Sequence, residues 1–326
     1  MIRGKKFFIG LALASLGVAC SSDDDFDRGN WVESSVFDGV PRSSAAAFTI
    51  DNLGYMGTGY DGDDYLTDFW EYNIEGDYWV QKADFPSTPR SAASAFTIDG
   101  KGYLGLGYDG DDELEDFWEY NPASNSWDSI ANFGGGVRRS ATGFAINGTG
   151  YVGTGYDGDN DVKDFWKYNP NTDQWTEMVG FGGGKRRDAA YFILNDLVYF
   201  GTGVTNGIYN TDFWQFDPAS EVWTRLNDLD EEDSYSVVRS NAVGFSQGGF
   251  GYFATGYNGG ALDTIWEYDP ANDDWEKITE FEATARQDAV SFNTDTRAFV
   301  LLGRTGSLYL DDNYEVFTQD EYDEED

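Results

Sequence analysis

Three loops of this sequence carry closely spaced carboxylates that could bind a divalent cation. They read YDGDDYLTD, YDGDDELED and YDGDNDVKD, and their aspartates include Asp61, Asp63, Asp64, Asp109, Asp111, Asp112, Asp157, Asp159 and Asp161. Alternating oxygen ligands suit Ca²⁺, although the spacing matches the DxDxDG pattern of calcium loops only in part. The competing explanation is a solvated turn, in which Gly supplies a positive φ and Asp favours the turn. Calcium is the one cofactor that this pattern suggests, and both interpretations stay open.

Two loops are basic against this acidic background. They read FGGGVRR (133–139) and FGGGKRR (181–187). Guanidinium groups beside flexible glycines can hold a carboxylate or sulfate, whereas charge balance against the DGD loops explains the same residues without a ligand. The tyrosines that open the acidic loops could stack on sugar rings. The predicted ligand-binding residues are Arg138, Arg139, Lys185, Arg186, Arg187, Tyr60, Tyr108 and Tyr156.

The composition excludes several kinds of chemistry. The 326 residues include no His and a single Cys, so His-based triads, His-ligated zinc and thiol nucleophiles in the body of the protein are excluded. Lys and Arg number 21 against 59 Asp and Glu, a net charge of -38. This balance disfavours nucleic acid as a partner, because phosphate binding needs a basic surface. Catalysis by carboxylates or tyrosines stays open.

The N-terminus predicts export and lipid anchoring. Residues 1–19 contain three basic residues, an apolar run and small residues before Cys20, and the segment resembles a bacterial lipoprotein signal peptide. Residues 20–29 then form an acidic tether that begins at a lipidated Cys20. We expect passage through the inner membrane and attachment at the outer membrane or cell surface, with membrane contact through the lipid alone. An ordinary signal peptide with an incidental Cys is the alternative.

A repeat of 47 to 52 residues organises the chain between residues 30 and 317. Five copies contain two Trp residues nine positions apart, as in Trp118 and Trp127. Trp31 is a second-type Trp without a first, and Tyr314 occupies a first-Trp position with no second Trp after it. The two partial repeats complete each other, which predicts a closed ring, because closure removes the exposed sheet edges that an open stack would leave.

Each repeat predicts four antiparallel strands. In the copy that begins at Arg90 these are SAASAFTI (91–98), GYLGLG (102–107), DFWEYN (116–121) and the strand around Trp127. The start of the first strand and the loop between the second and third then share one face of the ring. A repeated Arg facing a repeated Asp predicts structural ion pairs between Arg42, Arg90, Arg139, Arg187, Arg239 and Arg286 and Asp68, Asp116, Asp164, Asp212 and Asp312. The alternative is a central ring of Arg that faces a ligand.

These features resemble the kelch repeat family. The resemblance rests on the Arg at the start of each copy, the Gly pair, the aromatic residue and the second Trp, although ATG (254–256) and LLG (301–303) depart from the Gly pair. It implies an all-β, six-bladed kelch-type β-propeller closed by an N-terminal strand. The chain cannot carry the copper site of the kelch enzyme galactose oxidase, since His is absent. Residues 318–326 are expected to be an acidic disordered tail.

The leading functional hypothesis is a non-enzymatic binding propeller at the cell surface, with a glycan or protein ligand. Some kelch propellers are sugar mutarotases, so the second hypothesis is an enzyme acting on sugars, such as a mutarotase or lyase. The third is a structural surface module. An inward carboxylate without an Arg partner in a central pocket would favour the enzyme, whereas a flat face would favour a protein partner.

Overall fold

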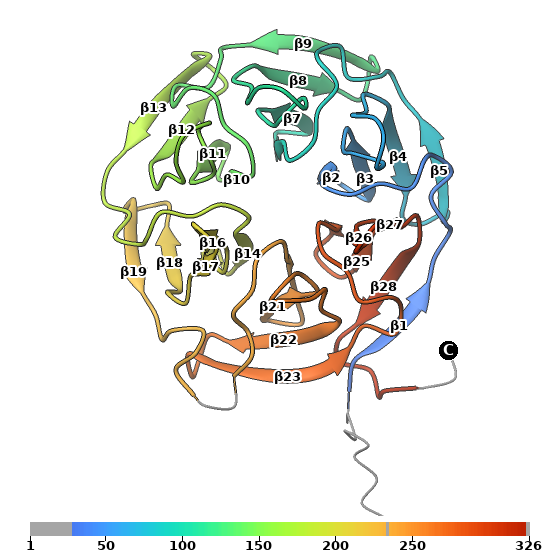
Figure 1. The fold of residues 1–326 in the computed structure, drawn as a ribbon, viewed down its shortest axis with the longest axis vertical. Helices are drawn as coiled ribbons and strands as arrows, with labels where there is room; N and C mark the ends of the chain where they lie inside the picture. Colours follow the sequence, from blue (N-terminus) through green and yellow to red (C-terminus); the bar gives the residue numbers. More distant parts are fainter. Residues whose placement is uncertain (1–27, 233–234, 324–326) are drawn as a thin grey trace, which may run out of the picture.

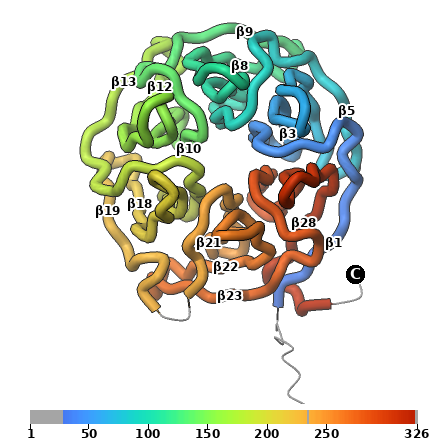
Figure 2. Tube along the Cα trace, in the orientation of Figure 1, coloured from blue at the N-terminus to red at the C-terminus, as the bar shows by residue number. Residues whose placement is uncertain are grey.

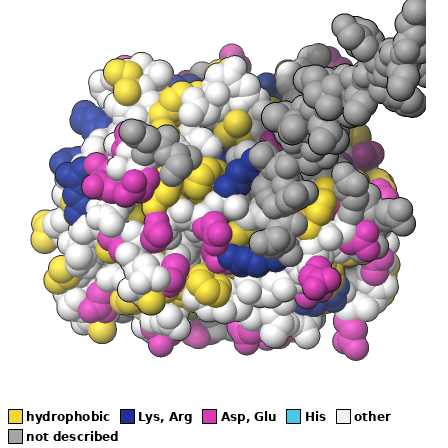
Figure 3. All heavy atoms as spheres, turned by 90° about the horizontal axis from the view of Figure 1, so that it is seen from below, with side chains coloured by type: hydrophobic (Ala, Val, Ile, Leu, Met, Phe, Trp, Pro, Cys, Tyr) yellow, Lys and Arg dark blue, Asp and Glu magenta, His cyan; other side chains and the backbone are white. Residues whose placement is uncertain are grey.

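The computed structural model describes residues 28–232 and 235–323, and within these ranges the regular structure is β. Six four-stranded antiparallel sheets surround a central opening like the blades of a propeller (Figures 1 and 2). The predicted six-bladed, all-β ring is therefore confirmed. Figure 3 looks onto the rim and shows acidic side chains spread over it with Lys and Arg between them. Among the described residues, no helix is long and apolar enough to cross a membrane.

The blades follow one another along the chain, each with its innermost strand first. Blade 1 contains β2 (Ala46–Ile50), β3 (Leu53–Gly57), β4 (Phe69–Asn73) and β5 (Tyr78–Gln81). Blade 2 contains β6 (Ser94–Ile98), β7 (Lys101–Gly105), β8 (Phe117–Asn121) and β9 (Ser126–Ile130). Blade 3 contains β10 (Thr142–Ile146), β11 (Thr149–Gly153), β12 (Phe165–Asn169) and β13 (Gln174–Met178).

The other three blades vary this plan. Blade 4 contains β14 (Ala190–Leu194), β15 (Leu197–Gly201), β18 (Trp214–Asp217) and β19 (Val222–Arg225), with a small hairpin of β16 (Val204–Thr205) and β17 (Ile208–Tyr209). Blade 5 contains β20 (Val243–Gln247), β21 (Phe250–Ala254), β22 (Thr264–Asp269) and β23 (Asp274–Glu280). Blade 6 contains β24 (Val290–Asn293), β25 (Ala298–Leu301), β28 (Asn313–Phe317) and β1 (Asn30–Glu33), with a hairpin of β26 (Arg304–Thr305) and β27 (Leu308–Tyr309).

The ring closes through its first and last strands, as the two partial repeats predict. β1 pairs with β28 in antiparallel register, with Trp31 opposite Val316 and Glu33 opposite Tyr314. Trp31 is buried, and its ring meets the edge of Phe281 with centroids 4.5 Å apart. Figure 2 shows the N-terminal strand lying beside the last blade. The strand that completes blade 6 therefore comes from the opposite end of the described chain.

Aromatic and glycine residues fit the blades together. A Cβ on Gly102 in β7 would lie only 2.0 Å from the ring of Phe48 in the neighbouring blade, so glycine gives that ring its space. In blades 1 to 3 the second Trp donates its indole N–H to the preceding connection, as Trp127 does to the carbonyl of Ala83 at 3.0 Å. The repeated Gly and Trp positions are therefore blade-to-blade contacts.

The described chain extends beyond the predicted boundaries of 30 and 317. Arg28 forms an ion pair of 2.6 Å with Glu267, so this part of the predicted tether lies against blade 5. At the other end, the amide and hydroxyl of Thr318 both donate to Oε1 of Gln247. Thr318 is buried, which corrects the expectation that the disordered tail begins at this residue. Cys20 and the predicted signal peptide lie outside the described residues.

Candidate functional site

Every blade begins with a tripeptide whose three residues have three different roles. The six tripeptides are RSS (42–44), RSA (90–92), RRS (138–140), RRD (186–188), RSN (239–241) and RQD (286–288). Their middle residues pair with the loops between the second and third strands, as Ser43 does with Tyr60 and Arg139 with Tyr156. We call this side of the ring the loop face. The prediction that blade starts and these loops share one face is confirmed.

The first residue of each tripeptide is a buried Arg that fixes the start of its blade. Arg42 pairs with Asp68 at 2.5 Å and Arg90 with Asp116 at 2.6 Å, and each guanidinium also donates to a backbone carbonyl. The same carboxylates accept from the first Trp of the repeat, as Asp68 does from Trp70 at 2.7 Å. Bidentate pairing of this kind orients both partners. The predicted structural role of the repeated Arg and Asp is therefore confirmed.

Blades 3 and 4 correct which Arg takes that role. Arg138, not Arg139, pairs with Asp164 at 2.9 Å, and Arg186, not Arg187, pairs with Asp212. Both guanidinium groups are enclosed and are not available to a ligand, which corrects their expected place in a basic binding cluster. The sequence held a signal for this, because the buried Arg always lies six residues before the Phe of the innermost strand.

Blade 5 lacks the carboxylate partner. Arg239 is fully buried, and its guanidinium donates to the hydroxyl of Thr264 at 2.9 Å and to the Thr264 carbonyl at 3.0 Å. Burial lowers the pKa of Arg239 from its ordinary value, because the charged form loses hydration, and the charge of Asp263 opposes this only in part. In blade 5 the buried Arg is thus held by neutral hydrogen-bond acceptors and not by a carboxylate.

The third residues of the tripeptides form a closed ring around the axis. They are Ser44, Ala92, Ser140, Asp188, Asn241 and Asp288, all with φ between 52° and 57°. The backbone N–H of each donates to the carbonyl of its counterpart in the preceding blade, at 2.9 to 3.3 Å, and Ser44 completes the circle by donating to Asp288. We call this opening the axial mouth. It encloses a pocket of about 170 Å³ above a channel of about 1200 Å³ along the inner strands.

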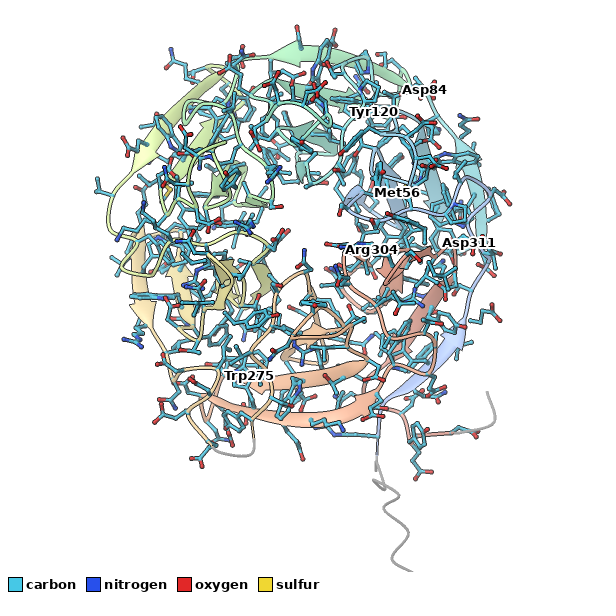
Figure 4. All side chains as sticks on the ribbon, in the orientation of Figure 1. Met56, Asp84, Tyr120, Trp275, Arg304 and Asp311 are labelled. Atoms are coloured by element: carbon cyan, nitrogen blue, oxygen red, sulfur yellow. The ribbon has the colours of Figure 1, made fainter. Side chains whose placement is uncertain are left out.

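The side chains of the axial mouth are asymmetric. Blades 1 to 3 contribute Ser, Ala and Ser, whereas blades 4 to 6 contribute Asp188, Asn241 and Asp288. The Asp288 carboxylate accepts from Nδ2 of Asn241 at 2.6 Å, from Nε2 of Gln287 at 2.8 Å and from Nε of Arg304 at 2.9 Å. Figure 4 shows Arg304 beside the central opening, whereas Trp275 lies closer to the rim. Asp288 is therefore a well-partnered anion.

Asp188 has a different environment in the same ring. Its side chain is 18% exposed, and the ion pair to Nε of Arg187 is long, at 3.5 Å. Burial raises the pKa of Asp188 to about 6, and the charge of Asp288 acts in the same direction, while Ser140, Arg187 and Arg139 oppose it. A carboxyl with this pKa exchanges its proton near neutral pH. The two carboxylates of the mouth thus differ in their contacts, since Asp288 accepts three side-chain hydrogen bonds and Asp188 has one long ion pair.

The half-buried arginines of the loop face have acidic partners. Arg139 pairs with Glu113 at 3.1 Å, and Arg187 pairs with Asp161 at 2.7 Å. The Arg139 guanidinium also lies 4.7 Å from the ring centroids of both Tyr108 and Tyr156. The structure therefore brings these predicted residues together, but as a neutralised surface. Lys185 is exposed, and its backbone carbonyl accepts from the hydroxyl of Thr205.

The predicted tyrosines are held against their own loops. The hydroxyls of Tyr60, Tyr108 and Tyr156 donate to the carbonyls of Gly62, Gly110 and Gly158 at 2.7, 2.6 and 2.9 Å. These contacts hold the rings against their own loops, and none of the three tyrosines lines the pocket at the axial mouth.

The acidic loops are turns stabilised by their first Asp. Oδ1 of Asp61 accepts from the backbone N–H groups of Asp63 and Asp64, at 2.9 and 2.7 Å. Asp109 and Asp157 repeat this arrangement. In the ranges that the structure covers, no group of three or more Asp, Glu, His or Cys side chains could hold a metal ion. The geometry therefore supports the turn explanation of these loops and gives the calcium hypothesis no ligand set.

Three polar residues that line the mouth, and Arg304 beside Asp288, were not predicted from the sequence. Asp188, Asn241, Asp288 and Arg304 were not among the predicted site residues. A signal was present, because the third tripeptide position is Ser or Ala in three blades and Asp or Asn in the other three. Aligning the repeats from the Phe of the innermost strand would have exposed this change.

Comparison with known proteins supports the class of fold. No protein-family model matches the sequence, and no curated protein matches it. A solved structure titled "Structure of YjhT" superimposes with a TM-score of 0.75, covering 85% of this chain and 95% of that chain at 18% identity. The protein is thus a six-bladed β-propeller with repeated, kelch-like blades. At this identity the likeness concerns the fold alone.

Proposed function

We propose that this protein is a binding propeller whose axial mouth holds a neutral glycan. The observation that carries the proposal is the gathering of Asp188, Asn241 and Asp288 at one side of a mouth that is otherwise lined by Ser and Ala. Carboxylates accept hydrogen bonds from sugar hydroxyls, and an amide side chain both accepts from them and donates to them. The kelch-like repeat supplies the scaffold, and the departures from it supply the site.

The charges around the mouth favour a neutral ligand over an anionic one. Arg139, Arg187 and Arg304 are each paired with a carboxylate, and Asp188 is a second carboxylate beside Arg187, so carboxylates outnumber these three arginines. An anionic ligand would have to displace a paired carboxylate and also approach Asp188, which costs electrostatic energy. This revises the expectation that the basic loops contact anionic groups.

Binding by the full chain to neutral and acidic glycans tests the proposal. We expect affinity for neutral glycans and a loss of about tenfold or more in Asp188→Ala, because a lost hydrogen bond to a charged group costs roughly 1.5 to 3 kcal/mol. Ala92 occupies the same ring position with the same backbone conformation, so the variant keeps the fold. Ser44→Ala, on the opposite side of the ring, is the matched control. Exclusive binding of acidic glycans, or of a protein with no sugar binding, would overturn the proposal.

A sugar-modifying enzyme is the second candidate, and Asp188 is the observation that favours it. A carboxyl whose pKa lies near 6, close to a second carboxylate in a different environment, resembles the acid and base arrangement that opens and closes a sugar ring. Polarimetry of freshly dissolved neutral sugars tests this: Asp188→Asn should abolish any acceleration of mutarotation. An unchanged rate in that variant would exclude a role for Asp188. A purely structural surface module would show neither binding nor acceleration.

We further propose that the chain is a lipoprotein anchored through Cys20, which would place the propeller at a membrane surface behind an acidic tether. The support comes from the leader that precedes Cys20 in the sequence. Cys20→Ser should release the protein from the membrane fraction. Recovery of that variant with membranes in high salt would contradict lipid anchoring.

A further inference from the structure

The loops of the loop face are linked from blade to blade. In each loop, one residue contacts the loop of the next blade, and we call it the linking residue. It pairs with the first residue of the loop, as Tyr65 pairs with Tyr60. Tyr309 of blade 6 lies against Gly62 of blade 1, where an added Cβ would be 2.8 Å from the ring. Tyr65 of blade 1 lies in the same way against Gly110 of blade 2, again at 2.8 Å. Each loop therefore supports the next.

The links continue through the next three blades with polar partners. Glu113 of blade 2 lies 3.1 Å from the Cβ position of Gly158 in blade 3. Asp161 of blade 3 accepts from the backbone N–H of Asn206 in blade 4 at 2.9 Å. Tyr209 of blade 4 then accepts, through its hydroxyl, from the N–H of Gly259 in blade 5 at 3.1 Å.

The links are interrupted between blades 5 and 6. The linking position of blade 5 is Ala261. The loop of blade 5 is also one residue shorter than that of blade 1. Its turn is closed by a hydrogen bond from the N–H of Asn258 to the carbonyl of Gly260, where blade 1 has the bond from Asp61 to Asp64. A Cβ on Gly306, in the facing loop of blade 6, would meet no atom within 4 Å. Of the six junctions between described loops, this one lacks the contact that the linking residue makes at the other five.

Tyr257 opens the blade 5 loop, pairs with Ala261 there, and differs from its counterparts in the other blades. The hydroxyls of the blade 1 to 3 tyrosines are bound to their own loops, and their rings contact other rings or arginines. Tyr257 is 36% exposed, and among the described residues neither its ring nor its hydroxyl has such a partner. An exposed, unengaged aromatic ring presents a stacking surface at little cost in ordering.

We propose that a bound glycan chain leaves the axial mouth across the junction of blades 5 and 6, with Tyr257 stacked on a sugar unit outside the mouth. The inference rests on the proposed function and adds the ligand's path and its class, a neutral oligosaccharide. Asn241 and Asp288 lie on the blade 5 and blade 6 sides of the mouth, and Arg304 lies beside them as a donor to hydroxyls that pass. Figure 4 shows Arg304 at this edge of the opening.

Binding measurements with six-unit fragments of glucan, mannan, galactan and xylan, each beside its monosaccharide, test the path. For a fragment that binds, Tyr257→Ala should weaken the hexasaccharide about fivefold to tenfold and leave the monosaccharide within about twofold, as expected for one lost stacking contact. Tyr60→Ala, the same change in blade 1, is the matched control and should leave both affinities unchanged. Equal losses for monomer and hexamer, or an equal effect of Tyr60→Ala, would overturn the path.

A second variant tests the same path without removing a contact. Ala261→Tyr restores the linking residue of the other blades and should weaken the hexasaccharide while sparing the monosaccharide. An unweakened hexasaccharide in this variant would also contradict the path. Should none of the four monomers or fragments bind, the proposed function itself fails, and the path fails with it. Binding of monomers with no added affinity in the hexamers would leave the mouth in place and reject only the path.

Discussion

Blades 1 to 3 and blades 4 to 6 share one scaffold but differ at the axis. In the first half, the loops are nearly identical, their tyrosines are held in place, and the mouth is lined by Ser44, Ala92 and Ser140. In the second half, the loops differ in length and sequence, and the mouth carries Asp188, Asn241 and Asp288. The regular half shows what the ring needs to fold. The irregular half carries residues that the fold of the ring does not require, and we propose that the site lies there.

The acidic loops of the regular half support the turn explanation over the calcium hypothesis. Their Asp residues look like a cation site in isolation, yet Asp61 and its counterparts are occupied by backbone N–H groups of their own turns. Repetition therefore marks structure even where the residue types suggest chemistry. The single-residue change at the third tripeptide position is the less conspicuous but more informative departure.

The largest expected effect on stability comes from removing the strand that closes the ring. Deleting residues 21–40 removes β1 with Trp31 and also Phe37, whose ring packs against Trp70 and Trp79. We expect a loss of about 5 kcal/mol or more in the free energy of unfolding, because large buried aromatics are lost and two sheet edges open. Thermal unfolding measures this. A melting temperature within a couple of degrees of the parent would show that the ring does not depend on closure.

The next effect compares the scaffold pair of blade 2 with its weakened version in blade 5. Asp116→Ala leaves Arg90 buried without its carboxylate and should cost about 3 to 5 kcal/mol. Thr264→Val removes one hydroxyl acceptor from Arg239 and should cost about 1 to 2 kcal/mol. Urea unfolding of both variants provides the measurement. Equal losses would mean that the carboxylate adds nothing in the regular half.

A pH-dependent effect distinguishes the two carboxylates of the mouth. Because the folded pKa of Asp188 is raised to about 6, its ionisation destabilises the fold as pH rises from about 4 through 6. Asp188→Asn should therefore stabilise the protein by roughly 1 to 3 kcal/mol at pH 8 and by about zero at pH 4. Asp288→Asn should instead destabilise at pH 8, because Arg304 loses its partner. The free energy of unfolding, measured at both pH values, tests this. The same stability change in both variants would contradict the predicted difference between the two carboxylates.

The smallest expected effect concerns the acidic loops of the regular half. Adding millimolar Ca²⁺ or a chelator should change the melting temperature by less than about 1 °C, because a ligand that does not bind the native state cannot stabilise it. Asp63→Asn with Asp111→Asn serves as the control. A rise of several degrees with Ca²⁺ that these substitutions abolish would restore the calcium hypothesis.

The sequence by itself determined the propeller, its number of blades and its closure. Trp pairs nine residues apart, the partial repeats at Trp31 and Tyr314 and the repeated Arg and Asp are local patterns, and repetition makes each of them visible six times or nearly so. The shared loop face also followed from the sequence, since strand order fixes which connections emerge together.

Only the tertiary structure decided which residues face the axis. Arg138 and Arg139 are neighbours in the chain, yet one is buried against Asp164 and the other lies on the loop face beside Glu113. Asp188, Asn241 and Asp288 are about fifty residues apart along the chain and meet because ring closure brings blades 4 to 6 to one mouth. Whether residues far apart in the chain meet depends on where each backbone turns. At these positions, a difference of one residue along the chain separates a side chain buried in the scaffold from one on the loop face.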